Sequence, residues 1–269
     1  MSSSSYQTLI YEERDRIARV QFNREKDTNA FSRQMTLELI DVCGRMRADA
    51  GTNAPRLDAL VLTGGTGRSF SVGGDFNDVS RLSEEPEIRA YLGEIIDLYI
   101  AVLDVEVPVV AAIDRFAIGQ GLQVALMADW RIGATSCRLQ MPELKNGVAC
   151  PLGSIILELM LGRARMQELV FDCEVIEPPA ARALGLLSQI VPTEELQDAA
   201  MAMARKLGAY PRRPFVTTKR IQNQRFVQAF EVVREPSSQA HVASFLERAG
   251  QKHFERILGT AEKGGGYGQ

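Results

Sequence analysis

Apolar residues recur along the chain with two different periods, which predict two kinds of element. The alternation at residues 17–22 and the continuous apolar runs at 57–63 and 109–113 are typical of buried strands. Apolar residues three or four positions apart, as in Met35, Leu39 and Met46, indicate a helix, with Ser32 as its N-cap. Further strands are expected at 8–11, 130–134 and 138–141, and further helices at 76–82, 87–105, 151–161, 166–171, 179–184, 194–207, 214–223 and 226–258.

The order of these elements predicts an α/β fold made of stacked strand-strand-helix units. We expect one such domain over residues 7–210, because no shift in composition marks a linker before about residue 210. A C-terminal helical region is expected at 211–259, and its apolar residues exceed what one small core needs. The serine-rich residues 1–6 and the glycine-rich residues 260–269 are expected to be flexible tails, and a charged turn is expected at 12–16.

Composition places the chain among soluble globular proteins. Hydrophobic residues make up 45% of the 269 residues and charged residues 24%. The net charge is −3, which gives no support to nucleic-acid binding, since binding phosphates requires a clustered basic surplus. No apolar run approaches the roughly 18 residues that a membrane span needs, and the N-terminus lacks the pattern of a signal peptide. We therefore expect a cytoplasmic protein with no membrane partner.

Cysteine and histidine usage argues against a metal site. The four cysteines, Cys43, Cys137, Cys150 and Cys173, form no C-x-x-C pair, so buried reduced thiols are expected. With only two histidines a three-histidine metal site is excluded. From its charged neighbours, His253 is expected on the surface, whereas a lone histidine within a helical pattern, such as His241, usually has a structural role.

Two strand-to-helix junctions share one construction. The strand at 57–63 leads to Gly73-Gly74-Asp75, and the strand at 109–113 leads to Gly119-Gln120-Gly121. Glycines let the backbone approach a ligand closely, and the first N–H groups of the following helix have no partner within the helix. Two such groups aimed at one oxygen form an oxyanion hole. Taken singly, each junction is better explained as an ordinary turn, and it is the pair that points to an oxyanion hole.

Glu143 is the candidate acid-base residue. It follows a short strand and stands among Leu139, Met141 and Leu144, an apolar setting in which a carboxylate suits the role of general base. A solvated loop glutamate is the alternative interpretation of the same pattern.

Several of these segments, taken in order, resemble the crotonase (enoyl-CoA hydratase/isomerase) superfamily over residues 8–258. The matching segments are 69–75, 108–114, 117–121, 129–131 and 141–143. The resemblance implies a crotonase-like spiral of ββα units, a C-terminal helical trimerisation region and an acyl-CoA thioester substrate. It places the two hole N–H groups on Gly74 and Gln120. It implies no tightly bound cofactor, since coenzyme A arrives as part of the substrate.

The chain departs from the hydratases of this superfamily at one acid-base position. Hydratases carry two glutamates, one of them three residues after the second hole residue. Here that position is Gln123, an amide that can orient a group but cannot transfer a proton. Of the two acid-base glutamates of the hydratases, this chain keeps Glu143, which argues against simple hydratase activity.

Further matching segments are 73–77, 96–99, 101–103, 141–145 with Gly147, 166–168, 218–220 and His241. Through these segments the chain most resembles, within the superfamily, the carboxymethylproline synthase subgroup of secondary metabolism. That resemblance implies decarboxylation of malonyl-CoA to a thioester enolate, attack on a small cyclic imine or aldehyde, and hydrolysis of the new thioester. Glu143 would activate the hydrolytic water, and Gln123 and His241 would contact the substrate. Further substrate-binding residues implied are Tyr91, Phe70, Val72 and Ala30. The subgroup has methionine at Gln120, tryptophan at Tyr91 and histidine at Asn146, so a different substrate is compatible with the match.

Two other functions compete with this one. In a single-glutamate enoyl-CoA isomerase or hydratase, Glu143 would shuttle a proton between carbons. In a catalytically silent crotonase-fold protein, the surface would bind a partner or RNA instead. The resemblance implies a homotrimer or a dimer of trimers in every case.

Overall fold

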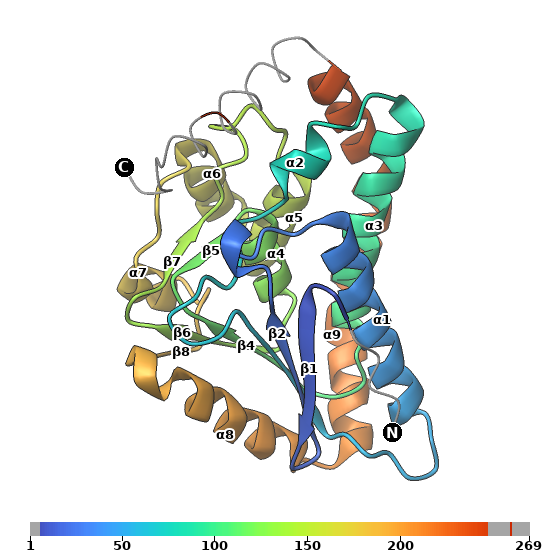
Figure 1. Ribbon diagram of the computed structural model, residues 1–269, viewed down its shortest axis with the longest axis vertical. Coiled ribbons are helices and arrows are strands. Elements are labelled where there is room, and N and C mark those ends of the chain that lie inside the picture. The colour runs from blue at the N-terminus through green and yellow to red at the C-terminus, as the bar shows by residue number, and fades with distance from the viewer. Residues whose placement is uncertain (1–5, 247–258, 260–269) are drawn as a thin grey trace.

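The centre of the molecule is a six-stranded sheet of order β1-β2-β3-β4-β6-β8 (Figure 1). A computed structural model describes residues 6–246 and 259 of the chain. β1 and β2 pair antiparallel, and the other pairs are parallel. The strands are β1 (Leu9–Arg14), β2 (Ile17–Phe22), β3 (Ala59–Thr63), β4 (Val109–Ile113), β6 (Trp130–Ala134) and β8 (Gln189–Val191). β5 (Phe116–Ile118) and β7 (Arg138–Gln140) form a separate parallel pair.

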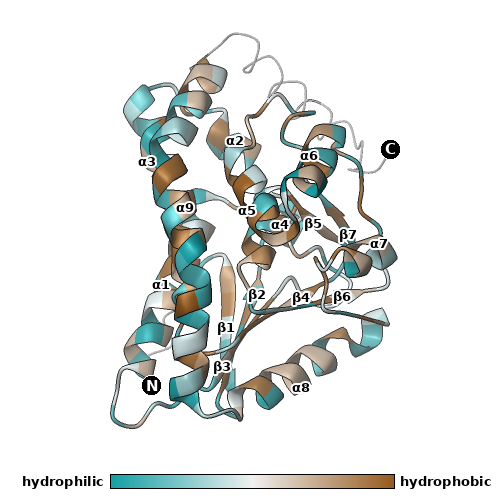
Figure 2. Cartoon of the chain, turned by 180° about the vertical axis from the view of Figure 1, so that it is seen from behind, coloured by the Kyte–Doolittle hydropathy of each residue, from teal (hydrophilic) through white to brown (hydrophobic). Residues whose placement is uncertain are grey.

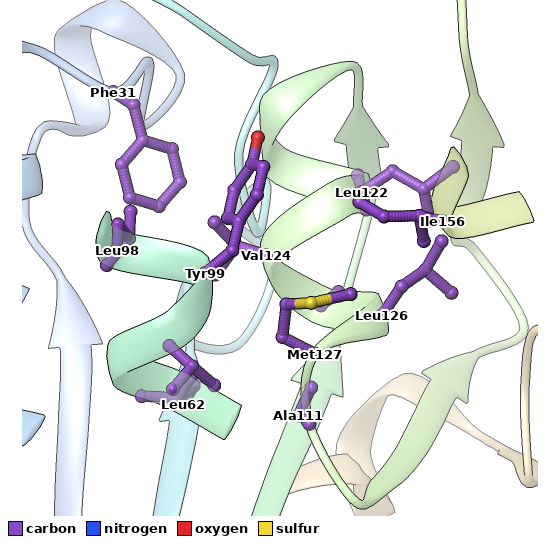
Figure 3. Packing of buried hydrophobic residues seen from close by; sticks show 14 of the residues in the cluster. Phe31, Leu62, Leu98, Tyr99, Ala111, Leu122, Val124, Leu126, Met127 and Ile156 are labelled. Atoms are coloured by element: carbon purple, nitrogen blue, oxygen red, sulfur yellow. The ribbon is translucent and has the colours of Figure 1, made fainter. Parts of the chain in front are cut away.

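Helices cover both faces of the large sheet, which is why its central strands are apolar along their whole length. Val61 and Ala112 pack on one face with Leu196 of α8 (Leu196–Gly208). Leu62 and Ala111, which alternate with them, belong to the larger core on the other face. Figure 3 shows Leu62 and Ala111 in this core near residues of α3 (Glu85–Leu103) and α4 (Gln120–Leu126).

The C-terminal region is one continuous helix, α9 (Arg212–Leu246), rather than the two expected segments at 214–223 and 226–258. Pro214 lies in its first turn, where proline is tolerated, and the helix also continues through Pro236. Arg89 and Arg234 form ion pairs that join α3 to α9. Figure 2 shows the two helices side by side. The helix therefore packs on its own chain, while residues 247–258 of the expected helix lie outside the described residues.

Local differences from the sequence-based expectations have simple causes. β1 extends to Arg14 because it forms a six-residue ladder with β2, so the expected turn at 12–16 shrinks to Asp15 and Arg16, both with positive φ. The three-residue strands β5 and β8 were not predicted. α2 (Phe76–Val79) ends three residues before the expected position, and Asp75 caps it by accepting a hydrogen bond from the Asn77 N–H.

The remaining elements complete the frame around the site. They are α1 (Arg33–Ala50), α5 (Pro151–Leu161), α6 (Arg163–Asp172), α7 (Pro178–Ala183) and the 3₁₀ turns Glu25–Asp27 and Thr193–Glu195. All four cysteines are buried and unpaired, as expected. Tyr6, within the expected N-terminal tail, donates a hydrogen bond to Asp41. The other tail residues and His253 lie outside the described part of the chain, within which no helix is long and apolar enough to cross a membrane.

Candidate active site

The structure brings the two glycine junctions together. A backbone bridge joins Ser71 to Ala117, and the Ile118 N–H donates to the Ser71 carbonyl at 2.9 Å. Gly73 has a φ of +102°, and a Cβ there would lie 3.1 Å from the Ile118 carbonyl oxygen and 3.6 Å from the Gln120 nitrogen. A side chain at this position would be strained and crowded, so glycine is required for the two junctions to meet.

The two predicted oxyanion-hole residues, Gly74 and Gln120, both line one cavity. Gln120 is the first residue of α4, so its N–H has no acceptor within the helix. Neither the Gly74 N–H nor the Gln120 N–H has a hydrogen-bond partner within the described residues. Gly119, with a φ of +52°, turns the chain immediately before the second donor. Two residues in neighbouring segments, each with a backbone N–H that lacks a partner in the described part of the chain, therefore line the cavity.

The cavity has a volume of about 1360 Å³ and extends from an apolar part to a charged part. Apolar side chains from α2 and α3 line one part, including those of Val79, Leu92 and Ile95. Arg115 and Arg138, from the segments around β5 and β7, line another. A site this large accommodates an extended substrate with both apolar and anionic groups.

Glu143 projects into this cavity beside the second junction. A Cβ on Gly119 would lie 3.3 Å from Glu143 Oε1. That oxygen accepts a hydrogen bond of 2.6 Å from Gln123 Nε2, while Oε2 is buried without a partner among the described residues. Burial raises the pKa of Glu143 to about 7, although the Gln123 and Cys150 donors partly oppose the rise. The alternative of a solvated loop glutamate is therefore wrong.

A hydrogen-bonded chain from α3 fixes the orientation of Glu143. The Tyr99 hydroxyl donates to Gln123 Oε1 at 2.7 Å, and Gln123 Nε2 donates to Glu143. Burial raises the pKa of Tyr99 well above its ordinary value, so its hydroxyl remains a donor and sets which way the amide faces. Gln123 thus positions the carboxylate, in addition to lining the cavity.

Tyr99 and Cys150 are site residues that sequence reasoning missed. One face of α3 carries residues spaced four apart, Tyr91, Ile95 and Tyr99. This spacing could have placed Tyr99 beside Tyr91 from the sequence alone. Cys150 is the N-cap residue of α5 and lines the cavity. Burial, together with the Glu143 carboxylate, raises the pKa of its thiol, so it remains protonated beside that carboxylate.

His241 reaches the cavity from α9. Its Nδ1 lies 2.8 Å from the Ser237 carbonyl oxygen, and its ring meets Phe245 edge-on. Burial lowers the pKa of His241, against the effect of the Ser237 and Ala149 carbonyls, so the ring is neutral at pH 7. The histidine therefore combines a structural hydrogen bond with a place in the lining.

Most of the predicted site residues line this one cavity: Val72, Gly74, Tyr91, Gln120, Gln123, Glu143 and His241. Phe70 and Ala30, also predicted to contact substrate, lie elsewhere. Phe70 is fully buried and packs edge-on against Phe22, with ring centroids 4.9 Å apart. Ala30 is buried, and its carbonyl accepts a hydrogen bond from Arg24. We find no cluster of metal-ligating side chains among the described residues.

Comparison with known proteins gives one family. The family described as enoyl-CoA hydratase/isomerase matches residues 12–263. A carboxymethylproline synthase from Pectobacterium carotovorum subsp. carotovorum is 38% identical over 252 residues, covering 93% of this chain and 99% of that protein. A crotonyl-CoA hydratase from Syntrophomonas wolfei subsp. wolfei is 30% identical over 195 residues, covering 71% and 72%.

Solved structures share the fold. ThnE from S. clavuligerus superposes with a TM-score of 0.74 at 34% identity, covering 86% of this chain and all of that one. An enoyl-CoA hydratase/isomerase from Mycobacterium paratuberculosis has a TM-score of 0.83 at 23% identity, covering 93% of this chain and 98% of that one.

Proposed function

The chain belongs to the enoyl-CoA hydratase/isomerase family, and on this premise we propose that it is a malonyl-CoA-decarboxylating, carbon–carbon bond-forming thioesterase. It is a crotonase-superfamily acyl-CoA enzyme, with relatives named as a synthase and as hydratases. The finer proposal rests on one observation about the two acid-base positions of the family. One holds a carboxylate, Glu143, and the other holds an amide, Gln123, which donates a hydrogen bond to it.

The first step needs no base. The bond between the malonyl carboxylate and the adjacent carbon breaks, CO₂ leaves, and the electron pair moves to the thioester as an enolate. The enolate oxygen would accept hydrogen bonds from the Gly74 and Gln120 N–H groups. One such fixed donor stabilises a transition state by about 3–4 kcal/mol.

The second step forms the new carbon–carbon bond. The α-carbon of the enolate attacks the electrophilic carbon of a small cyclic imine or aldehyde, and the thioester carbonyl re-forms. The imine nitrogen or aldehyde oxygen takes up the electron pair and then a proton. The hole residues Gly74 and Gln120 hold the thioester throughout, and the neutral His241 ring lines the same cavity.

Hydrolysis of the new thioester requires one base, which Glu143 can provide. Its carboxylate takes a proton from water as the water oxygen attacks the thioester carbon, and the thiol of coenzyme A leaves. A pKa of about 7 suits a general base at neutral pH. Gln123 and Tyr99 hold the carboxylate in place for this step. The chemistry uses coenzyme A within the substrate and needs no bound cofactor.

A single-glutamate enoyl-CoA isomerase is a second candidate, because a carboxyl group with a pKa near 7 also suits proton transfer between two carbons. Incubation with malonyl-CoA distinguishes the two reactions. The proposed reaction releases CO₂ and, with a cyclic imine present, free coenzyme A. An isomerase acting on a 3-enoyl-CoA releases neither, and release of neither product from malonyl-CoA would overturn the proposal.

A further inference from the structure

The Gln120 side chain carries a buried hydrogen-bond donor that lacks an acceptor in the described part of the chain. The residue is 8% exposed and lines the cavity. Its Nε2 is buried, and no group in the described part of the chain accepts a hydrogen bond from it. Burying an amide without a partner is unfavourable, so such a group within a substrate cavity indicates a ligand atom that completes it.

The Tyr91 hydroxyl lies close to the same hole residue, Gly74, as the Gln120 side chain. A Cβ built on Gly74 would be 3.1 Å from Tyr91 Oη and 3.4 Å from Gln120 Oε1. Burial keeps the phenol protonated by raising its pKa, so the hydroxyl can donate. No hydrogen bond from it is present among residues 6–246. Two neutral polar side chains, from α3 and α4, thus lie near Gly74 in the cavity lining.

We propose that this Gln120–Tyr91 pair binds the carboxylate of the malonyl group and so selects thioesters with an anionic substituent two bonds from the thioester carbonyl. The inference rests on the proposed function and deepens it. A substrate whose carbonyl oxygen sits on the Gly74 and Gln120 N–H groups must place its neighbouring substituent close to the hole. The phenol O–H faces that substituent, and the Gln120 amide, whose Oε1 lies nearest Gly74, offers its N–H once the amide is turned about its last side-chain bond.

Neutral donors suit a carboxylate that has to leave as CO₂. The carboxylate loses its negative charge during decarboxylation, while the enolate oxygen gains it. An ion pair with Lys or Arg would stabilise the starting carboxylate strongly and so raise the barrier. An amide and a phenol hold it more weakly yet fix its direction. The cationic residues Arg115, Arg138 and Lys145 line the cavity from segments around β5 and β7 rather than from α3 or α4.

A pair of inert ligands tests the inference without turnover. Sulfoacetyl-CoA carries a sulfonate that cannot leave as CO₂, and 3,3-dimethylbutanoyl-CoA replaces its three oxygens by methyl groups. We expect Gln120→Met, which keeps the backbone N–H, to weaken sulfoacetyl-CoA binding by about 10- to 100-fold, as for a lost hydrogen bond to a charged group. Tyr91→Phe should weaken it by about tenfold. Binding of the dimethylbutanoyl ligand should change less than about threefold in both variants.

Calorimetric titration of the folded full-length protein measures both affinities, and Gln7→Met, at an exposed position before β1, is the matched glutamine-to-methionine control. The inference would be overturned if both variants weakened the binding of the two ligands equally. It would also be overturned if neither variant changed the affinity for either ligand. Its failure is distinguishable from that of the proposed function. If the wild type releases no CO₂ from malonyl-CoA but still discriminates between the ligands, only the reaction assignment falls. If the wild type releases CO₂ but does not discriminate between the two ligands, only the assignment of the Gln120–Tyr91 pair to carboxylate binding is overturned.

Discussion

Around Glu143, burial and hydrogen bonding act against each other. Burial favours the neutral acid, whereas the Gln123 and Cys150 donors favour the carboxylate, and burial dominates. The balance leaves the group close to half ionised at neutral pH, poised between the forms that accept and donate a proton.

The raised pKa predicts a pH-dependent stability effect of Glu143→Gln. Folding takes up a proton at Glu143 between pH 4.5 and about 7, so this residue costs stability as the pH rises through that window. The full difference corresponds to about 3 kcal/mol. We expect the variant to exceed the wild type in free energy of unfolding by up to about that amount at pH 8 and by little at pH 4.5. Urea unfolding at both pH values checks this, and an equal difference at the two would contradict it.

Removing the Gln123 amide should shift the pH profile of thioester hydrolysis. Gln123→Leu deletes a donor that favours the carboxylate, so the pKa of Glu143 rises further and the base form appears at higher pH. We expect the rising limb of kcat/KM to move upward by about one pH unit. Gln7→Leu, at an exposed position before β1, is the matched control. An unshifted limb would show that Gln123 does not set this pKa.

At the level of single residues, the sequence brought the right residues to one cavity, and their chemical roles stay predictions. Glu143, Gly74 and Gln120 were identified from local pattern and resemblance, and they meet in one cavity. Tyr99 was missed, because its role depends on a bond between α3 and α4 that no local pattern reports. Phe70 was placed in the site, although it fills the core against Phe22.

Among the elements, the start of α4 carries the backbone N–H that we propose as the second oxyanion-hole donor. Gln120 is the first residue of that helix, the position at which proline fits best. Gln120→Pro should therefore remove the N–H while retaining the helix, and lower the decarboxylation rate by about 100- to 1,000-fold. Gln120→Ala keeps the N–H and separates this effect from loss of the side chain. Steady-state kinetics on malonyl-CoA makes the comparison, and equal rates for the two variants would contradict the assignment.

Element prediction succeeded where one periodic pattern decides the structure and failed where distant pairing does. The expected strands at 17–22, 109–113 and 130–134 match β2, β4 and β6 in full. The three-residue strands β5 and β8 exist only through pairing with β7 and β6, so their sequences carry little signal. The sequence-based prediction divided α9 into two helices, although ion pairs with α3 hold it as one continuous helix.

For the molecule as a whole, we predict assembly through a surface that includes α9. Phe226, Phe230 and Phe245 of this helix are buried within the chain, so part of the expected surplus of apolar surface is already covered. Ile221 and Val232 on the same helix remain 69% and 75% exposed. We predict a trimer of about 89 kDa, three times the 29.7 kDa chain, or a pair of trimers. Sedimentation equilibrium showing only the 29.7 kDa species would remove this prediction.

The most direct test of the central claim follows both products of malonyl-CoA in wild type and Glu143→Gln, with a cyclic imine present. CO₂ release reports the base-free step, and free coenzyme A reports hydrolysis. We predict that the wild type releases both, whereas Glu143→Gln still releases CO₂ and accumulates an acyl-CoA product with little free coenzyme A. Near wild-type release of coenzyme A by the variant would contradict the assignment of Glu143 as the hydrolytic base.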